Sequence, residues 1–454
     1  MTKLFQMRFL LAIMGALVLA LSLLFSNAPN PMPLTQTSTP DLEKIARTVV
    51  NFLSEAKFEE PCGLFNKEMA AAMPPEKLQE VWNDIIGKFG EFEEIAKTKL
   101  TEEAGYRMVY VTCKFAKTSL DLKVVFDKEA KIAGLWFFPA QSEATYKSPE
   151  YANPESFVEV EYVVGTGEWQ LPATLLVPKG KGPFPAVVLV HGSGPHDRDE
   201  TIGPNKPFKD LSWGLASRGI AVLCYEKRTK QYASKSANMM ENFTVDDETV
   251  NDALAAVDLL RKVEEIRSDR IFILGHSLGG MLAPRIASQD EQLSGLILLA
   301  ANTRSLPDMI IEQTEYLVSL DGEINAVEAE YLEEIKKQVK RIKKLDINEG
   351  EIVFGAARVY WADLMAYDPV KTARDLAIPM LIIQGGRDYQ VTMKDFEGWK
   401  EGLAGKDRVD FKFYPDLNHL FNSGTGKSTP TEYEKAGNVA QIVIEDIAKW
   451  IKNQ

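Results

Sequence analysis

From about residue 151 to the C-terminus, short continuous apolar runs alternate with longer segments whose apolar residues recur at helical spacing. The runs are typical of strands buried on both faces of a sheet, and the spaced pattern is typical of amphipathic helices. The predicted strands include PAVVLV, IAVLCY, RIFIL, LSGLILL and IPMLII. This alternation predicts an α/β fold over residues 151–454, with a mostly parallel central sheet and helices on both of its faces.

Residues 41–140 follow a different pattern. Apolar residues recur at helical spacing in LEKIARTVVNFLSEAKF and PEKLQEVWNDIIGKFGEF, and then alternate with polar ones in YRMVYVTCKFA, LDLKVVFDK and KIAGLWFFP. The order of helices followed by strands predicts a separate, small α+β domain. No residue in this segment suggests chemistry, so we interpret the domain as a packing or substrate-presenting module.

A long insertion separates the strand that ends near residue 301 from the strand that begins near residue 378. The insertion covers about residues 303–375 and contains the charged helical segment EINAVEAEYLEEIKKQVKRIKKLD. A charge run of this kind is usually the solvated face of a helix. Because ligands of parallel sheets bind beyond the carboxyl ends of the strands, an insertion at that end is expected to cover the site as a cap.

The first 40 residues predict export. Lys3 and Arg8 precede the apolar run of residues 9–25, and small residues follow it, which is typical of a signal peptide. The run is long for a cleaved peptide, and a proline directly follows the candidate cleavage position, so an uncleaved membrane anchor remains open. We therefore predict a signal peptide or anchor over residues 1–28, a Pro, Thr and Ser linker over residues 29–40, and a periplasmic, extracellular or membrane-anchored protein.

Composition and charge narrow the range of partners. Of the 454 residues, 45% are hydrophobic and 26% are charged, as in ordinary globular proteins. The formal net charge of −13 argues against binding to nucleic acid, because phosphate recognition requires clustered positive charge. A nucleic acid partner is therefore not expected.

Three cysteines are present, Cys62, Cys113 and Cys224, and none has the spacing of a metal ligand set. Export would permit a disulfide between Cys62 and Cys113, but two free thiols fit the sequence equally well. Cys224 lies in an apolar run and is expected to be a small core residue. No metal is predicted.

The candidate chemistry begins at Ser277, in the sequence GHSLG. The predicted strand RIFIL comes directly before this motif and a predicted helix comes directly after it. A strand, a tight turn and a helix are the context of a nucleophile elbow, in which the flanking glycines, Gly275 and Gly279, leave room for the turn. We therefore predict that Ser277 is a nucleophile.

A serine nucleophile needs a base, and the chain has four histidines. His276 lies inside the elbow, where its side chain should diverge from the serine hydroxyl, and His191 and His196 precede the serine. His419, in the sequence YPDLNHLF, follows the last predicted strand, which is the order that this kind of elbow requires. His419 is therefore the predicted base.

The base in turn needs a carboxylate that fixes its tautomer. Asp388 follows the strand IPMLII and a pair of glycines, which places it at the carboxyl edge of the predicted sheet. Asp308, which follows the preceding strand, is the competing candidate. The predicted triad is Ser277, Asp388 and His419.

The oxyanion of the reaction needs two preorganised donors. We expect one to be the backbone amide of Leu278, directly after the nucleophile at a helix N-terminus. The other is expected in the loop HGSGPHDRDE, with the backbone of Ser193 favoured over Gly192, although a plain turn would also explain the glycines. In the same loop, Arg198 is an ion-pairing residue or a candidate substrate contact.

With these motifs, residues 151–454 resemble bacterial serine esterases of the α/β-hydrolase fold, close to exported or thermophilic carboxylesterases that carry HGSGP-x-DRDE before the elbow. Residues 41–140 resemble the cone-shaped α+β modules of uncharacterised function that precede hydrolase domains in some exported bacterial proteins. The resemblance implies hydrolysis of small carboxylic esters, with short acyl groups, through an acyl-enzyme intermediate and without a cofactor. A peptidase, a thioesterase or a polysaccharide deacetylase on the same fold remains open, as does a catalytically silent binding module.

Overall fold

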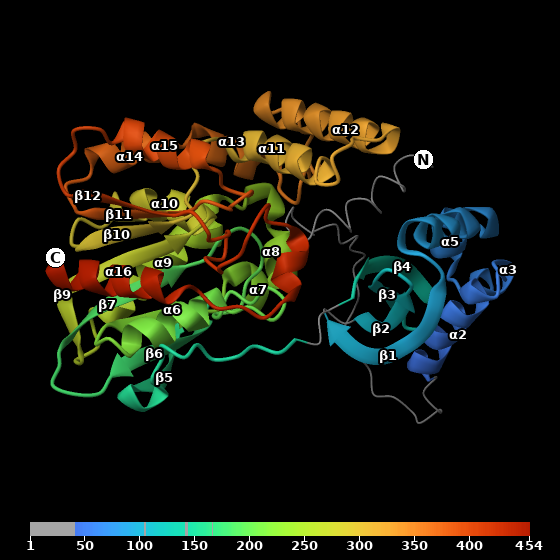
Figure 1. The fold of residues 1–454 in the computed structure, drawn as a ribbon, viewed down its shortest axis with the longest axis horizontal. Coiled ribbons are helices and arrows are strands. Elements are labelled where there is room, and N and C mark those ends of the chain that lie inside the picture. The colour runs from blue at the N-terminus through green and yellow to red at the C-terminus, as the bar shows by residue number, and fades with distance from the viewer. Residues whose placement is uncertain (1–40, 104–105, 141–143, 166) are drawn as a thin grey trace. The chain divides into compact units, whose positions relative to one another are not determined.

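A computed structural model describes residues 41–103, 106–140, 144–165 and 167–454 (Figure 1). The chain divides into two compact units, one that ends at residue 141 and one that continues from residue 142 to the C-terminus. The predicted signal peptide or anchor and the linker lie outside the described residues. Among the described residues, no helix has both the length and the apolar character that a membrane crossing requires.

The N-terminal unit packs helices against a four-stranded antiparallel sheet in the order β1-β2-β3-β4. Its elements are α2 (Leu42–Ser54), α3 (Glu59–Cys62), α4 (Lys67–Ala72), α5 (Pro75–Phe89), β1 (Phe92–Glu103), β2 (Tyr106–Phe115), β3 (Ser119–Phe126) and β4 (Ile132–Pro139). The unit is α+β, as predicted. The core contains Trp82 of α5 and Val111 of β2, and Cys62 and Cys113 are both free thiols.

Two features of this unit differ from the expectation. The sequence pattern predicted a helix that runs on to Phe92, but α5 ends at Phe89, because Gly90 takes a φ of 84°, which continues no helix. The strand β1 was not predicted at all. Its sequence, FEEIAKTKLTEE, is rich in charged residues and leaves Leu100 half exposed, so it lacks a clear apolar face.

The C-terminal unit is built on an eight-stranded sheet, counted over the described residues, with the order β12-β11-β10-β9-β7-β8-β6-β5. The strands from β8 to β12 in this order are parallel, and β6 and β5 are antiparallel to their neighbours. Their bounds are β5 (Phe157–Val164), β6 (Leu171–Pro178), β7 (Phe184–Val190), β8 (Ala221–Tyr225), β9 (Ile266–His276), β10 (Gly295–Leu299), β11 (Met380–Gly385) and β12 (Val409–Tyr414). The mostly parallel sheet confirms the predicted fold class.

Helices cover both faces of this sheet (Figure 1). One face packs against α9 (Asn251–Leu260), α10 (Leu278–Ala287), α14 (Pro369–Asp375) and α15 (Met393–Gly402), and the other packs against α6 (Pro207–Ala216) and α16 (Gln441–Asn453). Adjacent residues of β7, such as Val187 and Val188, enter opposite cores because side chains alternate along a strand. The helices outside the insertion are α6 (Pro207–Ala216), α7 (Arg228–Gln231), α8 (Ala233–Asn238), α9 (Asn251–Leu260), α10 (Leu278–Ala287), α15 (Met393–Gly402) and α16 (Gln441–Asn453).

Shorter helical turns join these elements. They are the 3₁₀ turns Pro154–Ser156, Met240–Asn242 and Pro430–Glu434, and a π-helical turn, η3 (Asp246–Val250), that leads directly into α9. The segment TVDDETVNDALAAVDLLRK, which begins at Thr244, has acids in its first turn and apolar residues at helical spacing, a pattern typical of one continuous α-helix. The first turn is wider than an α-helix, and π-helical turns of this kind occur often at functional sites.

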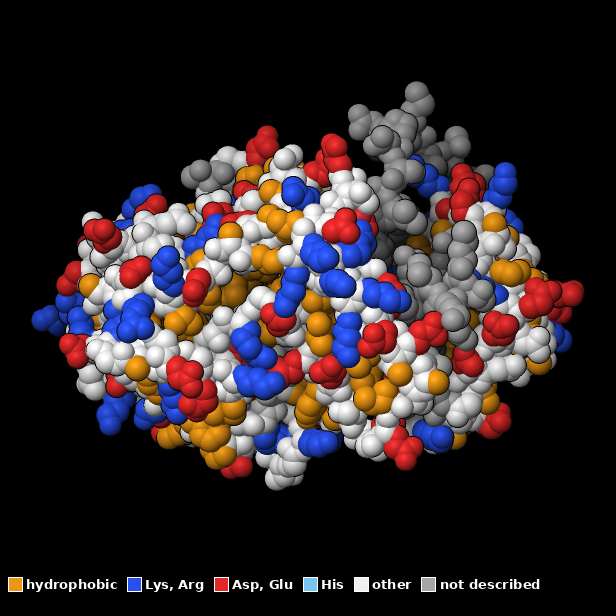
Figure 2. Space-filling view, turned by 90° about the horizontal axis from the view of Figure 1, so that it is seen from above, with side chains coloured by type: hydrophobic (Ala, Val, Ile, Leu, Met, Phe, Trp, Pro, Cys, Tyr) orange, Lys and Arg blue, Asp and Glu red, His pale blue; other side chains and the backbone are white. Residues whose placement is uncertain are grey.

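The insertion between β10 and β11 contains α11 (Leu306–Val318), α12 (Ala326–Lys343), α13 (Arg358–Ala366) and α14 (Pro369–Asp375). The helix α12 lies against α11 and buries Leu332, Ile335 and Val339. The helix therefore has one buried apolar face, and its charged residues lie on the outer face. Seen from above, basic and acidic side chains are mixed over the surface (Figure 2). Pairs such as Lys337 with Glu334, 3.5 Å apart, are typical of a solvated helix face.

Candidate active site

Ser277 lies on a strained turn between β9, which ends at His276, and α10, which begins at Leu278. Its φ of 53° and ψ of −119° are rare for a residue with a side chain. The turn needs its glycines: a Cβ atom on Gly275 would lie 2.2 Å from the carbonyl oxygen of Gly279, and one on Gly279 would lie 2.2 Å from that of Val190. The chain thus stores strain at this serine, which is the geometry of a nucleophile elbow.

His419 and Asp388 form a buried pair at the same edge of the sheet. Nδ1 of His419 donates a hydrogen bond to Oδ2 of Asp388 over 2.7 Å, and the two residues are 3% and 6% exposed. The other carboxylate oxygen of Asp388 accepts from the amides of Gln390 and Val391. The carboxylate is therefore held in place by its own loop, and it leaves Nε2 of His419 as the nitrogen available for proton transfer.

His276 connects the elbow to this pair. Its Nδ1 lies 2.9 Å from Oε2 of Glu200, and its Nε2 donates to the carbonyl of His419 over 3.0 Å. Burial lowers the pKa of His276, but the Glu200 carboxylate and the His419 carbonyl outweigh that effect and raise the pKa overall. Burial likewise opposes the charge on Glu200, but the charge of His276 lowers the pKa of Glu200 to about 2. A buried ion pair thus fixes the residue before Ser277 against the backbone of His419.

The loop after β7 approaches the elbow closely. A Cβ atom on Gly192 would lie 3.2 Å from Cβ of Ser277, so only glycine fits there without displacement. The amide of Gly192 donates to Oε1 of Glu200 over 2.8 Å and is therefore engaged. Among the described residues, the amides of Ser193 and Leu278 have no hydrogen-bond acceptor. These two N–H groups remain available to a ligand.

The other candidate residues lie apart from this cluster or support it. Arg198 forms ion pairs with Glu161, over 2.8 Å, and Glu226, over 2.9 Å. These contacts fit the first of its two predicted roles, ion pairing, and give no support to the second, a contact with substrate. Asp308 lies in the first turn of α11, where its carboxylate accepts from the hydroxyl of the N-cap residue Ser305 and pairs with Lys343, so it does not accept from His419.

The two remaining histidines brace the loop after β7. His191 donates from Nε2 to the carbonyl of Asp197, and burial lowers its pKa to about 3, so its ring is neutral. His196 donates from Nε2 to the carbonyl of Ser193 over 2.7 Å. Neither ring is paired with a carboxylate, which sets both apart from His419.

Three buried charged residues in or next to the loop after β7 escaped the sequence reasoning: Glu200, Lys227 and Glu248. Lys227 donates from Nζ to the carbonyl of Gly192 and pairs with Glu248, each over 2.6 Å. The available signal was that Glu200 ends the loop motif and that Lys227 comes two residues after a buried strand, where a charged side chain reaches the carboxyl edge of the sheet. Glu248 gave no such signal, because it reads as an ordinary acid in the first turn of a helix.

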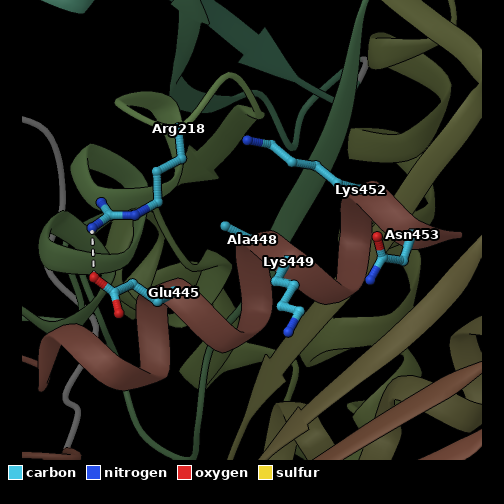
Figure 3. Close-up of a pocket in the computed structure, with 6 residues that line it drawn as sticks. All are labelled: Arg218, Glu445, Ala448, Lys449, Lys452 and Asn453. Atoms are coloured by element: carbon cyan, nitrogen blue, oxygen red, sulfur yellow. Dashed lines mark ion pairs between the residues drawn. The ribbon is translucent and has the colours of Figure 1, made fainter.

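A surface pocket of about 290 Å³ lies beside α16, away from these residues (Figure 3). It is lined by Arg218, Glu445, Ala448, Lys449, Lys452 and Asn453. Arg218 faces Glu445 at 3.6 Å, so the guanidinium charge in this pocket already has a carboxylate partner. Among the described residues, no group of three or more His, Cys, Asp or Glu side chains is placed to hold a metal ion. The hydrogen-bonded cluster around Ser277 is therefore the candidate active site.

The sheet order, the strained serine and the buried Asp–His pair define a serine hydrolase of the α/β-hydrolase class. Residues 182–422 match the family described as "Serine aminopeptidase, S33", and the chain belongs to this family. Residues 46–135 match a second family, described as "Protein of unknown function (DUF3887)".

The chain is also similar to individual known proteins. The chain is 41% identical over 402 residues to "Esterase EstD" of Thermotoga maritima, a match that covers 88% of this chain and 93% of that protein. It is 29% identical over 127 residues to "2,6-dihydropseudooxynicotine hydrolase" of Paenarthrobacter nicotinovorans, which covers 28% of this chain and 31% of that protein. A solved structure, Est1E from Butyrivibrio proteoclasticus, is 17% identical with a TM-score of 0.42 and covers 64% of this chain and 98% of its own.

Proposed function

We propose that this protein is a serine carboxylesterase that hydrolyses small carboxylic esters with short acyl groups through an acyl-enzyme intermediate. The observation that carries the proposal is the buried 2.7 Å hydrogen bond between His419 and Asp388, which the ion-paired His276 joins to the strained turn at Ser277. Its relative in Thermotoga maritima, aligned over 88% of this chain, is named an esterase.

In the proposed reaction, His419 removes the proton from the Ser277 hydroxyl, and the oxygen attacks the ester carbonyl. Asp388 keeps the proton on Nδ1 of His419, so that Nε2 is free to act as the base, and it stabilises the imidazolium that forms. His419 then protonates the leaving alcohol. Water, activated by the same histidine, hydrolyses the acyl-enzyme and regenerates Ser277.

The negative charge on the substrate oxygen requires donors that are in place before the reaction starts. The amides of Leu278 and Ser193 are the proposed donors. In support, Leu278 begins α10, where the helix dipole favours a negative charge, and Gly192 brings the loop backbone within contact of Ser277.

The N-terminal 28 residues are proposed to direct export, as a cleaved signal or as an anchor. The positive charges of Lys3 and Arg8, followed by the apolar run, support this proposal. The N-terminal sequence of the protein recovered from membrane and soluble fractions of expressing cells tests it. A mature chain that begins at residue 1 in the cytosolic fraction would contradict export.

A substrate panel and an activity probe test the enzymatic proposal together. We expect hydrolysis of p-nitrophenyl esters, fastest for short acyl chains, and little turnover of aminoacyl amides, acyl thioesters or acetylated polysaccharide. A fluorophosphonate should label the wild type and not the Ser277→Ala variant. Faster cleavage of aminoacyl amides than of esters would favour a peptidase, which the family description also allows. A wild type that neither labels nor hydrolyses any of these substrates would favour a silent binding module.

A further inference from the structure

Lys227 is a buried charge that the proposed reaction does not use. It follows β8, and the residue is 2% exposed. A buried ammonium group is costly unless it is paired and hydrogen-bonded, so the partners of Lys227 show which groups it holds in place. Its Nζ donates to the carbonyl oxygen of Gly192 over 2.6 Å, in the loop that supplies a proposed oxyanion donor.

The backbone N–H and C=O groups of Gly192 and Ser193 are hydrogen-bonded within the described residues, except the amide of Ser193. The amide of Gly192 donates to Glu200, the carbonyl of Gly192 accepts from Lys227, and the carbonyl of Ser193 accepts from His196. The amide of Lys227 also donates to the carbonyl of His196 over 3.0 Å. Of the backbone groups of Gly192 and Ser193, the amide of Ser193 is the one without an acceptor among the described residues.

The planarity of the peptide bond links these contacts to catalysis. In a trans peptide the C=O of one residue and the N–H of the next point in opposite directions. Because Lys227 holds the C=O of Gly192, it also fixes the direction of the Ser193 N–H, which points away from the ammonium. Rotation of this peptide would turn the amide away from its ligand and break the 2.6 Å hydrogen bond to Lys227.

Lys227 is in turn held by residues outside the loop. Its Nζ lies 2.6 Å from Oε1 of Glu248, on the π-helical turn η3, and Oε2 of Glu248 accepts from the hydroxyl of Tyr360 over 2.6 Å. Tyr360 lies on α13, within the insertion between β10 and β11. The ammonium of Lys227 and the carboxylate of Glu248 thus each have two polar partners, and hydrogen bonds of this kind restrict the motion of a buried network.

We propose that Lys227 is a positioning residue of the oxyanion hole, which binds the carbonyl of Gly192 and thereby aims the amide of Ser193, with Glu248 and Tyr360 fixing its ammonium. This inference rests on the proposed esterase function. The competing explanation is that Lys227 does no more than neutralise the buried carboxylate of Glu248.

A charge-balanced double variant separates the two explanations. Lys227→Met alone would leave Glu248 buried and unpaired, so Lys227→Met combined with Glu248→Gln is the main test, and Lys230→Met, at an exposed position one turn further along the chain, is the matched control. The measurements are kcat and KM for a short p-nitrophenyl ester, and the inhibition constant of a trifluoromethyl ketone, whose serine adduct places an oxyanion in the hole.

We expect kcat of the double variant to fall on the order of 10- to 100-fold, with KM changed by less than about threefold. The reason is that the amide of Ser193 would stabilise an oxyanion that forms in the transition state and is absent from the bound substrate. The inhibition constant of the ketone should rise by a similar factor, and Lys230→Met should match the wild type. A folded double variant with wild-type kcat and ketone affinity would overturn the inference.

If the double variant does not fold, Tyr360→Phe distinguishes the two explanations, since it removes one hydroxyl from the same network. A several-fold loss of kcat with a parallel loss of ketone affinity supports the positioning role, and unchanged values overturn it. A wild type without ester hydrolysis or labelling would instead overturn the proposed function, and this inference with it. An active wild type with unaffected variants overturns the inference alone.

Discussion

Replacement of Glu200 by glutamine tests whether the buried ion pair with His276 holds the active-site loops together. Glu200 is 1% exposed and accepts both from the amide of Gly192 and from the ring of His276. Glutamine can still accept from the amide, but it carries no charge to pair with the imidazolium. The variant therefore leaves His276 buried between two acceptors without its counter-ion.

The size of the effect follows from the pKa of Glu200. A shift from the ordinary value of 4.5 to about 2 corresponds to roughly 3 kcal/mol of stabilisation, at about 1.4 kcal/mol per pKa unit. The loss of one partner of a buried ion pair typically costs about 3–5 kcal/mol, which agrees with this figure. We expect Glu200→Gln to lower the melting temperature by about 5–8 °C, because the entropy of unfolding of so large a unit makes each kcal/mol worth only about 1.5 °C.

The pH dependence of the difference in stability between the wild type and Glu200→Gln provides a second check. The pKa of Glu200 is lowered in the folded state, so its stabilisation is present above about pH 4.5 and is lost as the pH falls toward 2. The pKa of His276 is raised, so its stabilisation is present below its ordinary value of 6.5 and is lost as the pH rises through the folded pKa. The pair therefore contributes fully between about pH 4.5 and 6.5.

Thermal unfolding of the wild type and Glu200→Gln, followed by circular dichroism from pH 3 to 9, measures both effects. The difference between the two proteins should be largest near pH 5 to 6 and should shrink toward both ends of the range. Glu291→Gln, at an exposed position, is the matched control and should unfold with the wild type. A difference below about 1 kcal/mol at every pH would refute the reasoning, since exposed pairs contribute no more than that.

Four further substitutions test individual contacts. Asp388→Asn should lower kcat by about 10⁴-fold, because the histidine loses its fixed tautomer, whereas Asp308→Asn should stay within about twofold of the wild type; the reverse result in ester hydrolysis would make Asp308 the acid. Arg198→Ala should leave KM unchanged and reduce stability by about 1 kcal/mol in thermal unfolding, as expected for a loop ion pair; a large rise in KM would instead make it a substrate contact. Gly279→Ala should destabilise the protein by about 3 kcal/mol in denaturant unfolding, because its Cβ would meet the Val190 carbonyl; a stable variant would disprove the tight elbow.

The hydrophobic pattern was sufficient to predict the central fold. The strands of the parallel sheet are continuous apolar runs, and such runs are unambiguous when helices separate them. The strand β1 was missed because its exposed, charged sequence follows no clear alternation. The π-helical turn at Asp246 was missed because its sequence has the acids and the apolar spacing of an ordinary helix start.

Part of the candidate site could likewise be predicted from the sequence, and part could not. Ser277, Asp388 and His419 each follow a strand, so their order and their common edge could be read from the sequence. The contact between Ser277 and His419 stays a prediction. The sequence indicated only that Glu200 and Lys227 lie near this edge of the sheet; their roles could not be predicted, because each depends on which backbone group the side chain meets after folding. Burial of a charged side chain is a property of the tertiary structure and has no signature in the local pattern.

The most direct test of the account is a crystal structure of the protein inactivated by an ester-like phosphonate. We predict a covalent bond from Oγ of Ser277 to phosphorus, with Nε2 of His419 within hydrogen-bond distance of an adduct oxygen. The phosphoryl oxygen should accept from the amides of Leu278 and Ser193. An adduct on another residue, or a His419 ring too distant to exchange a proton with the serine oxygen, would contradict the account.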